Sequence, residues 1–186
     1  MTTSSGYKFI DANGSHEFSD IFASRQIFEA LNNTSNLWNI SGVSPVQVFS
    51  GTTWNQVNGN NHSIAIKNDN TLWAWGPNDY GECGVGTSSI WGSVAYDDGY
   101  GNITYNWEVI TSATVNSPTQ IVNSSAWSQV VNNNNNAMLG IKGDGSLWAC
   151  GYNAQYRLGD GTTVNKSLPV QVTSMIPWKQ VIYGER

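Results

Sequence analysis

The stretch that decides the fold occurs twice in the chain. Residues 64–76 read IAIKNDNTLWAWG, and residues 139–151 read LGIKGDGSLWACG. In each copy apolar residues alternate along a first strand, a turn rich in Asn, Asp or Gly follows, and Leu-Trp-Ala begins a return strand. Two β-hairpins with one pattern predict an all-β architecture built from repeats.

Shared elements flank both hairpins. Upstream, a proline is followed nine positions later by a tryptophan in three places, at Pro45 and Trp54, Pro118 and Trp127, and Pro169 and Trp178. Downstream, residues 78–86 align with residues 153–161, and both are glycine-rich loops. The third copy holds only the proline and tryptophan part, so the pattern begins three times and is completed twice.

These elements, in this order, resemble the blades of the RCC1-repeat family, which run Pro-x-Gln-Val, Trp, hairpin, Leu-Trp-x-Trp-Gly and Asn-x-x-Gly-x-Leu-Gly-x-Gly. The match covers about residues 44–186. Three positions depart from the family pattern, namely Cys83, Cys150 and Tyr156. The resemblance implies β-propeller blades, each a four-stranded antiparallel sheet, in a ring of typically about seven.

The resemblance also sets the expected domain organisation. Residues 44–116 form one blade, residues 117–167 form a second, and residues 168–186 supply the starting strand of a third. Compared with the second repeat, the first carries extra residues between its glycine-rich loop and the next proline. This insertion, residues 88–113, is predicted to be a protruding hairpin.

The insertion is the predicted binding surface. It carries five aromatic residues, Trp91, Tyr96, Tyr100, Tyr105 and Trp107. Aromatic side chains on loops anchor interfaces and stack on sugars. The alternative, equally weighted, is that these rings pack on the adjacent blade.

Two blades and one strand do not close a ring, because propellers need at least about four blades. Exposed strand edges favour association. We therefore expect a homo-oligomer, with a trimer as the preferred symmetry, in which the terminal strand completes a blade of a neighbour. The residues assigned to this assembly are Trp178, Val181 and Tyr183. The alternative is a partial product whose blades pack on a partner.

Residues 1–43 lie outside the repeats and are interpreted as an anchor or oligomerisation segment. Apolar residues near helical spacing predict a short helix over Ser19–Leu31. Residues 12–23 resemble a segment that precedes repeat domains in some phage structural proteins. A helix that covers an open blade edge is the alternative interpretation.

Composition excludes several classes of function. The net charge is −5 with only 8 basic residues, too few for a nucleic-acid surface. No apolar run reaches the roughly 20 residues of a membrane span, and the polar N-terminus is unlike a signal peptide.

The sequence contains no catalytic or metal-binding motif, so we predict no enzyme activity, metal or cofactor. Asp97 and Asp98 come closest to a metal site, but two carboxylates fall short of the ligands that Ca²⁺ requires. The cysteines Cys83 and Cys150 are expected to be buried. The RCC1 resemblance implies a structural role for His62.

These observations lead to two hypotheses of function. The first is a phage virion structural or attachment protein (a fibre, spike or decoration subunit), which contacts other virion proteins and binds a host surface glycan or protein. The second is an RCC1-like propeller that binds and regulates or inhibits a partner protein.

Overall fold

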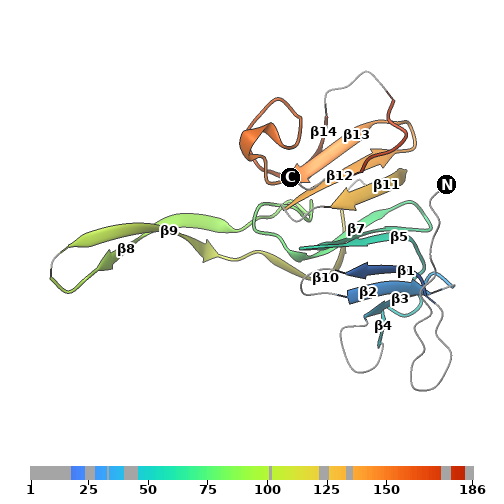
Figure 1. Ribbon diagram of the computed structural model, residues 1–186, viewed down its shortest axis with the longest axis horizontal. Coiled ribbons are helices and arrows are strands. Elements are labelled where there is room, and N and C mark those ends of the chain that lie inside the picture. Colours follow the sequence, from blue (N-terminus) through green and yellow to red (C-terminus); the bar gives the residue numbers. More distant parts are fainter. Residues whose placement is uncertain are drawn as a thin grey trace.

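The computed structural model describes residues 18–23, 28–32, 34–39, 46–100, 102–121, 126–132, 136–172 and 177–182. These residues form three four-stranded antiparallel sheets and one two-stranded ribbon (Figure 1). The described residues contain no α-helix, and their one helical element is the short 3-10 turn η1 (Ala154–Tyr156). The predicted all-β class is therefore confirmed.

Each sheet follows the chain in order from its first strand to its fourth. Sheet 1 contains β1 (Phe18–Ala23), β2 (Phe28–Asn32), β3 (Leu37–Asn39) and β4 (Val46–Val48). Sheet 2 contains β5 (Trp54–Gly59), β6 (Ser63–Lys67), β7 (Leu72–Pro77) and β10 (Thr114–Gln120). Sheet 3 contains β11 (Trp127–Asn132), β12 (Ala137–Lys142), β13 (Leu147–Gly151) and β14 (Lys166–Gln171). The ribbon contains β8 (Ile90–Asp97) and β9 (Ile103–Thr111).

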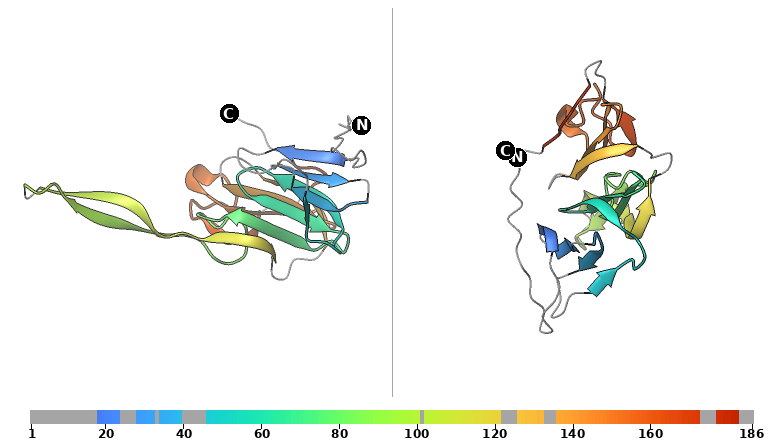
Figure 2. Two further views of the ribbon diagram at one scale, coloured as in Figure 1. Left: turned by 90° about the horizontal axis from the view of Figure 1, so that it is seen from below. Right: turned by 90° about the vertical axis from the view of Figure 1, so that its right-hand side faces the viewer.

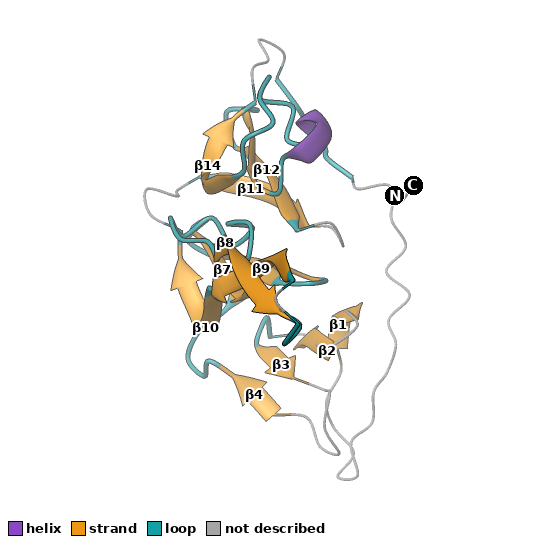
Figure 3. Cartoon of the chain, turned by 90° about the vertical axis from the view of Figure 1, so that its left-hand side faces the viewer, coloured by secondary structure: helices purple, strands orange, loops and turns teal. Residues whose placement is uncertain are grey.

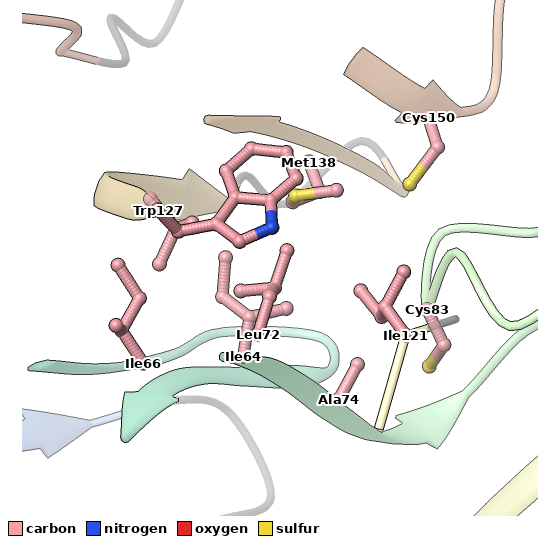
Figure 4. Close-up of a cluster of buried hydrophobic side chains, with 10 residues drawn as sticks. Ile64, Ile66, Leu72, Ala74, Cys83, Ile121, Trp127, Met138 and Cys150 are labelled. Carbon is pink, nitrogen blue, oxygen red and sulfur yellow. The ribbon is translucent and has the colours of Figure 1, made fainter. Parts of the chain in front are cut away.

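The sheets lie one above the other, like neighbouring blades (Figure 3). The clusters of buried hydrophobic side chains lie between them. Between sheets 2 and 3, Ile64, Ile66 and Leu72 face Trp127 and Met138 (Figure 4). Cys83 and Cys150 belong to the same cluster and are fully buried as free thiols, which confirms their expected burial. A second cluster, around Trp54 and Leu37, joins sheet 1 to sheet 2.

The sequence repeat and the sheet are offset by one strand. The Pro-x-Gln-Val element, which begins each repeat, forms the fourth and outermost strand of the preceding sheet, as β4, β10 and β14 do. Pro118 and Pro169 lie in these edge strands, where the register shifts. An edge position tolerates proline, because no further strand lies beside it that would need a hydrogen bond from the N–H that proline lacks.

The predicted helix over Ser19–Leu31 is wrong, because β1 and β2 occupy this segment as an antiparallel pair. A register shift between Phe18 and Asp20 interrupts the simple alternation of a strand. Sheets 2 and 3 have the same shift in their first strands, between Trp54 and Gln56 and between Trp127 and Gln129. Strands β1 to β4 therefore form a further four-stranded sheet, although β1 to β3 lie in the segment that was expected to be outside the blades. The expected boundary at residue 43 lies outside the described residues.

One backbone contact repeats at every junction. The N–H of Trp54 donates to Ser35 O, that of Trp127 donates to Asn70 O, and that of Trp178 donates to Gly145 O, at 2.9, 3.2 and 2.9 Å. Each tryptophan thus begins its segment against a turn of the preceding sheet. Residues 177–182 lie on sheet 3 in this way.

Candidate interaction hairpin

The candidate site is the β8–β9 ribbon, which is inserted between the third and fourth strands of sheet 2. It projects away from the three sheets, as two perpendicular views show (Figures 1 and 2). Its strands pair from Ile90 and Thr111 at the root to Asp97 and Ile103 near the tip. The insertion predicted over residues 88–113 is therefore a protruding hairpin.

The strand register divides the ribbon into two faces, because residues paired across antiparallel strands project to the same side. Ser93 pairs with Trp107, and Ala95 pairs with Tyr105. The small side chains on β8 leave the rings on β9 uncovered. Alternate residues of β9 form an apolar face, which we define as Ile103, Tyr105, Trp107 and Val109.

This apolar face is open to solvent. Tyr105 and Trp107 are each 71% exposed, and Ile103 and Val109 are also exposed. Monomeric proteins expose single apolar residues routinely, but a contiguous row of them marks an interaction surface. Ile103 and Val109 were not among the predicted binding residues, although their alternation with Tyr105 and Trp107 identifies them.

The opposite face, which we call the polar face, carries Tyr96, Thr104, Asn106 and Glu108, although Val94 and, near the root, the exposed Ile110 also belong to it. The hydroxyl of Tyr96 donates to Glu108 Oε1 at 2.6 Å, and this hydrogen bond to a carboxylate raises the pKa of Tyr96. Asn106 and Thr104 lie on the same side, since they pair with Val94 and Tyr96. The predicted set of five aromatic residues is therefore separated, with Tyr96 on the face opposite Tyr105 and Trp107.

The two remaining aromatic residues lie at the ends of the ribbon. Tyr100, at the tip, is 92% exposed. Its backbone N–H donates to Asp98, and Asn102 donates both its backbone and side-chain N–H to the same carboxylate. Trp91, near the root, is half-buried and stacks on Tyr80 of the body. Of the five aromatic residues, Trp91 therefore packs on the body, and the other four rings are exposed.

The charge of the hairpin is of one sign. Residues 88–113 contain Asp97, Asp98 and Glu108 and no Lys or Arg. In the described part of the chain no group of three His, Cys, Asp or Glu side chains is placed to hold a metal ion. The hairpin therefore offers aromatic contact area with an acidic border.

The assembly residues lie apart from the hairpin, on sheet 3. Val181 exchanges two hydrogen bonds with the side chain of Gln129, at 2.9 and 3.0 Å, and Trp178 remains 41% exposed. Tyr183 lies outside the described residues. The described residues also contain no helix long and apolar enough to cross a membrane.

His62 lies at the end of the β5–β6 connection, near the root of the hairpin. Its backbone carbonyl accepts hydrogen bonds from Asn132 Nδ2 and from the N–H of Asn60. The imidazole is fully buried, and neither ring nitrogen has a partner among the described residues. Burial lowers the pKa of His62 to about 4, so the ring is neutral at physiological pH.

Comparison with known protein families finds two regions of RCC1 repeat. Profiles described as the Regulator of chromosome condensation (RCC1) repeat match residues 59–82 and residues 144–186. Among curated proteins, the X-linked retinitis pigmentosa GTPase regulator homolog of Caenorhabditis elegans is 50% identical over 46 residues. That match covers 23% of this chain and 3% of the relative.

Solved structures confirm the propeller character of the fold. Prp20p from Saccharomyces cerevisiae superimposes with a TM-score of 0.64 and 16% identity, over 88% of this chain and 40% of Prp20p. Yeast RCC1 (Prp20) in its complex with Kap60 gives a TM-score of 0.63 and 17% identity, over 88% and 38% of the two chains. The chain thus carries RCC1 repeats and has the fold of part of an RCC1 propeller, and it spans less than half of these structures.

Proposed function

We propose that this chain is a partner-protein-binding module of the RCC1-propeller type, which regulates its partner by contact and performs no chemistry of its own. The observation that carries the proposal is the apolar face of the β8–β9 hairpin. Its rings stand on a ribbon that projects from the body, where the core sheets do not cover them. Such a surface becomes buried only when a second molecule covers it.

The comparisons support the regulatory hypothesis over the virion hypothesis. Prp20p is described with binding properties to Gsp1p and histones, and yeast RCC1 was solved bound to Kap60. The matching C. elegans protein is a homolog of a GTPase regulator. Proteins that share these repeats are thus described by the proteins they bind or regulate. Nothing comparable supports a place in a phage particle.

The side chains of the face suit protein recognition. Trp and Tyr are over-represented among the residues that dominate interface energies, and each such anchor contributes about 2 kcal/mol or more. A two-stranded hairpin alone is marginally stable in water, so covering its apolar face stabilises both the ribbon and the complex.

The charges of the hairpin favour a partner with a basic border. Asp97, Asp98 and Glu108 are the only charged residues between positions 88 and 113. Opposite charge around an apolar contact accelerates association and disfavours acidic competitors. We therefore expect binding to weaken, chiefly through a slower on-rate, as salt is raised.

The test is affinity capture from the source cells, followed by titration of the captured protein in purified form. The Tyr105→Ala/Trp107→Ala double variant removes the two largest rings of the apolar face. Asn106→Ala is the matched control, because Asn106 lies on the same strand but on the polar face. We expect the double variant to bind about 1,000-fold more weakly, from two anchors of about 2 kcal/mol each, and the control to bind like the parent. Equal affinity of the double variant and the parent rejects the hairpin as the contact site.

Self-assembly is the second candidate, and one observation favours it. Residues 177–182 lie on sheet 3 with the same tryptophan contact by which β11 begins on sheet 2, and Trp178 stays partly exposed. A second copy that covers this segment would bury Trp178. Light scattering tests this candidate, since a strict monomer at all concentrations rejects it and a trimer supports it.

A further inference from the structure

A row of aromatic rings joins the root of the hairpin to sheet 3. Trp91 of β8 stacks on Tyr80, with ring centroids 5.7 Å apart and an angle of 22° between the planes. Tyr80 also contacts Tyr152, which follows β13, and their ring centroids are 4.7 Å apart. The guanidinium of Arg157 then lies 5.4 Å from the centre of the Tyr152 ring. The row therefore runs from the ribbon, through the loop that follows β7, to the loop that follows β13 in sheet 3.

Hydrogen bonds secure the root itself to sheet 2. The hydroxyl of Ser89 donates to Asp79 Oδ1 at 2.5 Å and accepts the N–H of Ala113 at 2.8 Å. The N–H of Asn78 donates to Ala113 O at 2.9 Å. These bonds fix where the two strands leave the body. All of them lie at one end of the ribbon, so they leave its direction to be set by a lateral contact.

The stacked rings provide that lateral contact. Trp91 is the second residue of β8, and β8 extends for 8 residues, or roughly 26 Å at about 3.3 Å per residue. A small rotation at the root therefore displaces the tip by many ångströms. The buried Nε1 of Trp91 has no hydrogen-bond partner among the described residues, so ring contact rather than a hydrogen bond holds this side chain.

Comparison of the two repeats shows that the loop itself does not need these tyrosines. Tyr80 aligns with Gln155 in the second repeat, and Tyr152 aligns with Pro77 in the first. Both loops nevertheless keep the same internal hydrogen bond, which the N–H of Cys83 donates to Asn78 Oδ1 and the N–H of Leu158 donates to Asn153 Oδ1. The two rings occur only at the junction that borders the hairpin.

We propose that Tyr80 and Tyr152 are positioning residues, which fix the direction of the hairpin relative to sheet 3 by holding Trp91. The angle between sheets 2 and 3 is thereby coupled to the position of the hairpin tip. The purpose of this positioning, to present the apolar face in one orientation, rests on the proposed function. The geometry is testable without a partner.

The experiment measures the distance from the tip to sheet 3 by pulsed electron spin resonance. Spin labels are placed at Tyr100→Cys and Val164→Cys, which are 92% and 63% exposed positions. The native Cys83 and Cys150 are fully buried and do not compete for the label. The distance distribution is compared in this background, in Tyr80→Ala and in Tyr152→Ala.

We expect both alanine variants to broaden the distribution at least about twofold, because the lateral contact is lost. Tyr80→Phe retains the ring and should stay narrow. Tyr156→Ala is the second control, because that exposed ring has no ring contact within the described residues. Unchanged width and mean in both alanine variants overturn the proposal.

Two readouts keep the result interpretable. Circular dichroism identifies a variant that fails to fold, and Tyr152→Ala, which leaves sheet 2 intact, then carries the test alone. The Tyr105→Ala/Trp107→Ala variant should keep the narrow distribution, since neither ring belongs to the row. A variant that loses partner binding but keeps a narrow distance distribution tests the proposed function alone. A variant with a broad distance distribution tests the positioning role of Tyr80 and Tyr152.

Discussion

Gln56 and Val130 exchange two hydrogen bonds across the junction between sheets 2 and 3. The side-chain Nε2 donates to Val130 O at 2.9 Å, and the N–H of Val130 donates to Gln56 Oε1 at 3.1 Å. Gln129 and Val181 repeat the exchange at the next junction, at 3.0 and 2.9 Å. The glutamine of each Trp-x-Gln-Val motif thus acts as a strand-like partner for the following unit, and Gln180 occupies the same position in the third copy.

The first prediction concerns this exchange. Gln56→Leu should lower the free energy of unfolding by about 1–3 kcal/mol, because it leaves the buried N–H of Val130 without an acceptor. The carbonyl of Val130 is spared, since Asn58 also donates to it. Denaturant titration measures the loss, and Gln120→Leu, on an exposed edge strand, is the control.

The equivalent substitution at the next junction, in Gln129, should affect only the segment that this glutamine contacts. Gln129→Leu is expected to accelerate amide hydrogen exchange in residues 177–182, with little change in β5 to β7. A uniform increase across all three sheets would contradict this view of the exchange.

The second prediction concerns Gly81, which has φ +85°. A Cβ added there would lie 2.5 Å from Ser167 Cα of β14, a backbone atom of the neighbouring sheet. Gly81→Ala should therefore destabilise the protein by about 2–5 kcal/mol, through overpacking and a left-handed backbone that disfavours a side chain. Gly51→Ala separates the two causes, because Gly51 has φ +81° and nothing within 4 Å. We expect it to cost only about 1–2 kcal/mol.

The aligned position in the second repeat makes the converse test. Tyr156 has φ +62° and a side chain that is 62% exposed. Tyr156→Gly should be neutral or stabilising by up to about 1 kcal/mol, because it relieves the backbone strain. Marked destabilisation would show that the tyrosine ring is itself part of the packing.

The third prediction concerns pH and His62. The pKa of the buried imidazole is about 4, against 6.5 for an ordinary histidine, so the unfolded state binds the additional proton between these values. The stability that a neutral His62 contributes is present above pH 6.5 and is lost as pH falls toward 4, by about 3 kcal/mol in total. His62→Ala, which introduces the residue that Ala137 supplies in sheet 3, should abolish this slope. Denaturation midpoints measured from pH 4 to 7 provide the check.

The fourth prediction concerns Glu82, whose effect has the opposite sign. Its carboxyl is fully buried, one oxygen accepts the N–H of Tyr80 at 2.7 Å, and the other has no partner among the described residues. Burial raises the pKa of Glu82 to about 7, so the folded state retains a proton that the unfolded state loses above 4.5. Stability therefore falls as pH rises from 4.5 to 7, by about 3 kcal/mol.

The substitution Glu82→Gln should remove this loss and make the protein more stable than the parent at pH 8. Glu108→Gln, on the half-buried ribbon position that accepts the Tyr96 hydroxyl, is the matched control and should leave the pH profile of stability unchanged, because glutamine keeps an acceptor for that hydroxyl. Since the slopes of His62 and Glu82 oppose each other between pH 4.5 and 6.5, the parent should show a flatter profile than either variant. A steep profile in the parent would argue that one of the two groups is not buried as described.

The candidate site was predictable in position but not in organisation. The insertion was found by comparing repeat lengths, and its aromatic content follows directly from the sequence. The register decides that Tyr105 and Trp107 share a face and that Tyr96 lies on the other, because each cross-strand pair fixes a side. The stacking of Trp91 on Tyr80 and the contact of Tyr80 with Tyr152 join residues of three different segments, so no local sequence pattern predicts them.

The amino-acid sequence by itself determined the hairpins at residues 63–77 and 137–151. Their signals are local: alternation along each strand, and an Asp in each turn whose carboxylate accepts hydrogen bonds from the residue two positions later, as Asp69 does with Thr71 and Asp144 with Ser146. Only the tertiary structure decided that Phe18–Ala23 is a strand and that each Pro-x-Gln-Val element belongs to the preceding sheet. A strand needs hydrogen bonds to a neighbour, and here the neighbour and the register shift between Phe18 and Asp20 overrode the local spacing that favoured a helix.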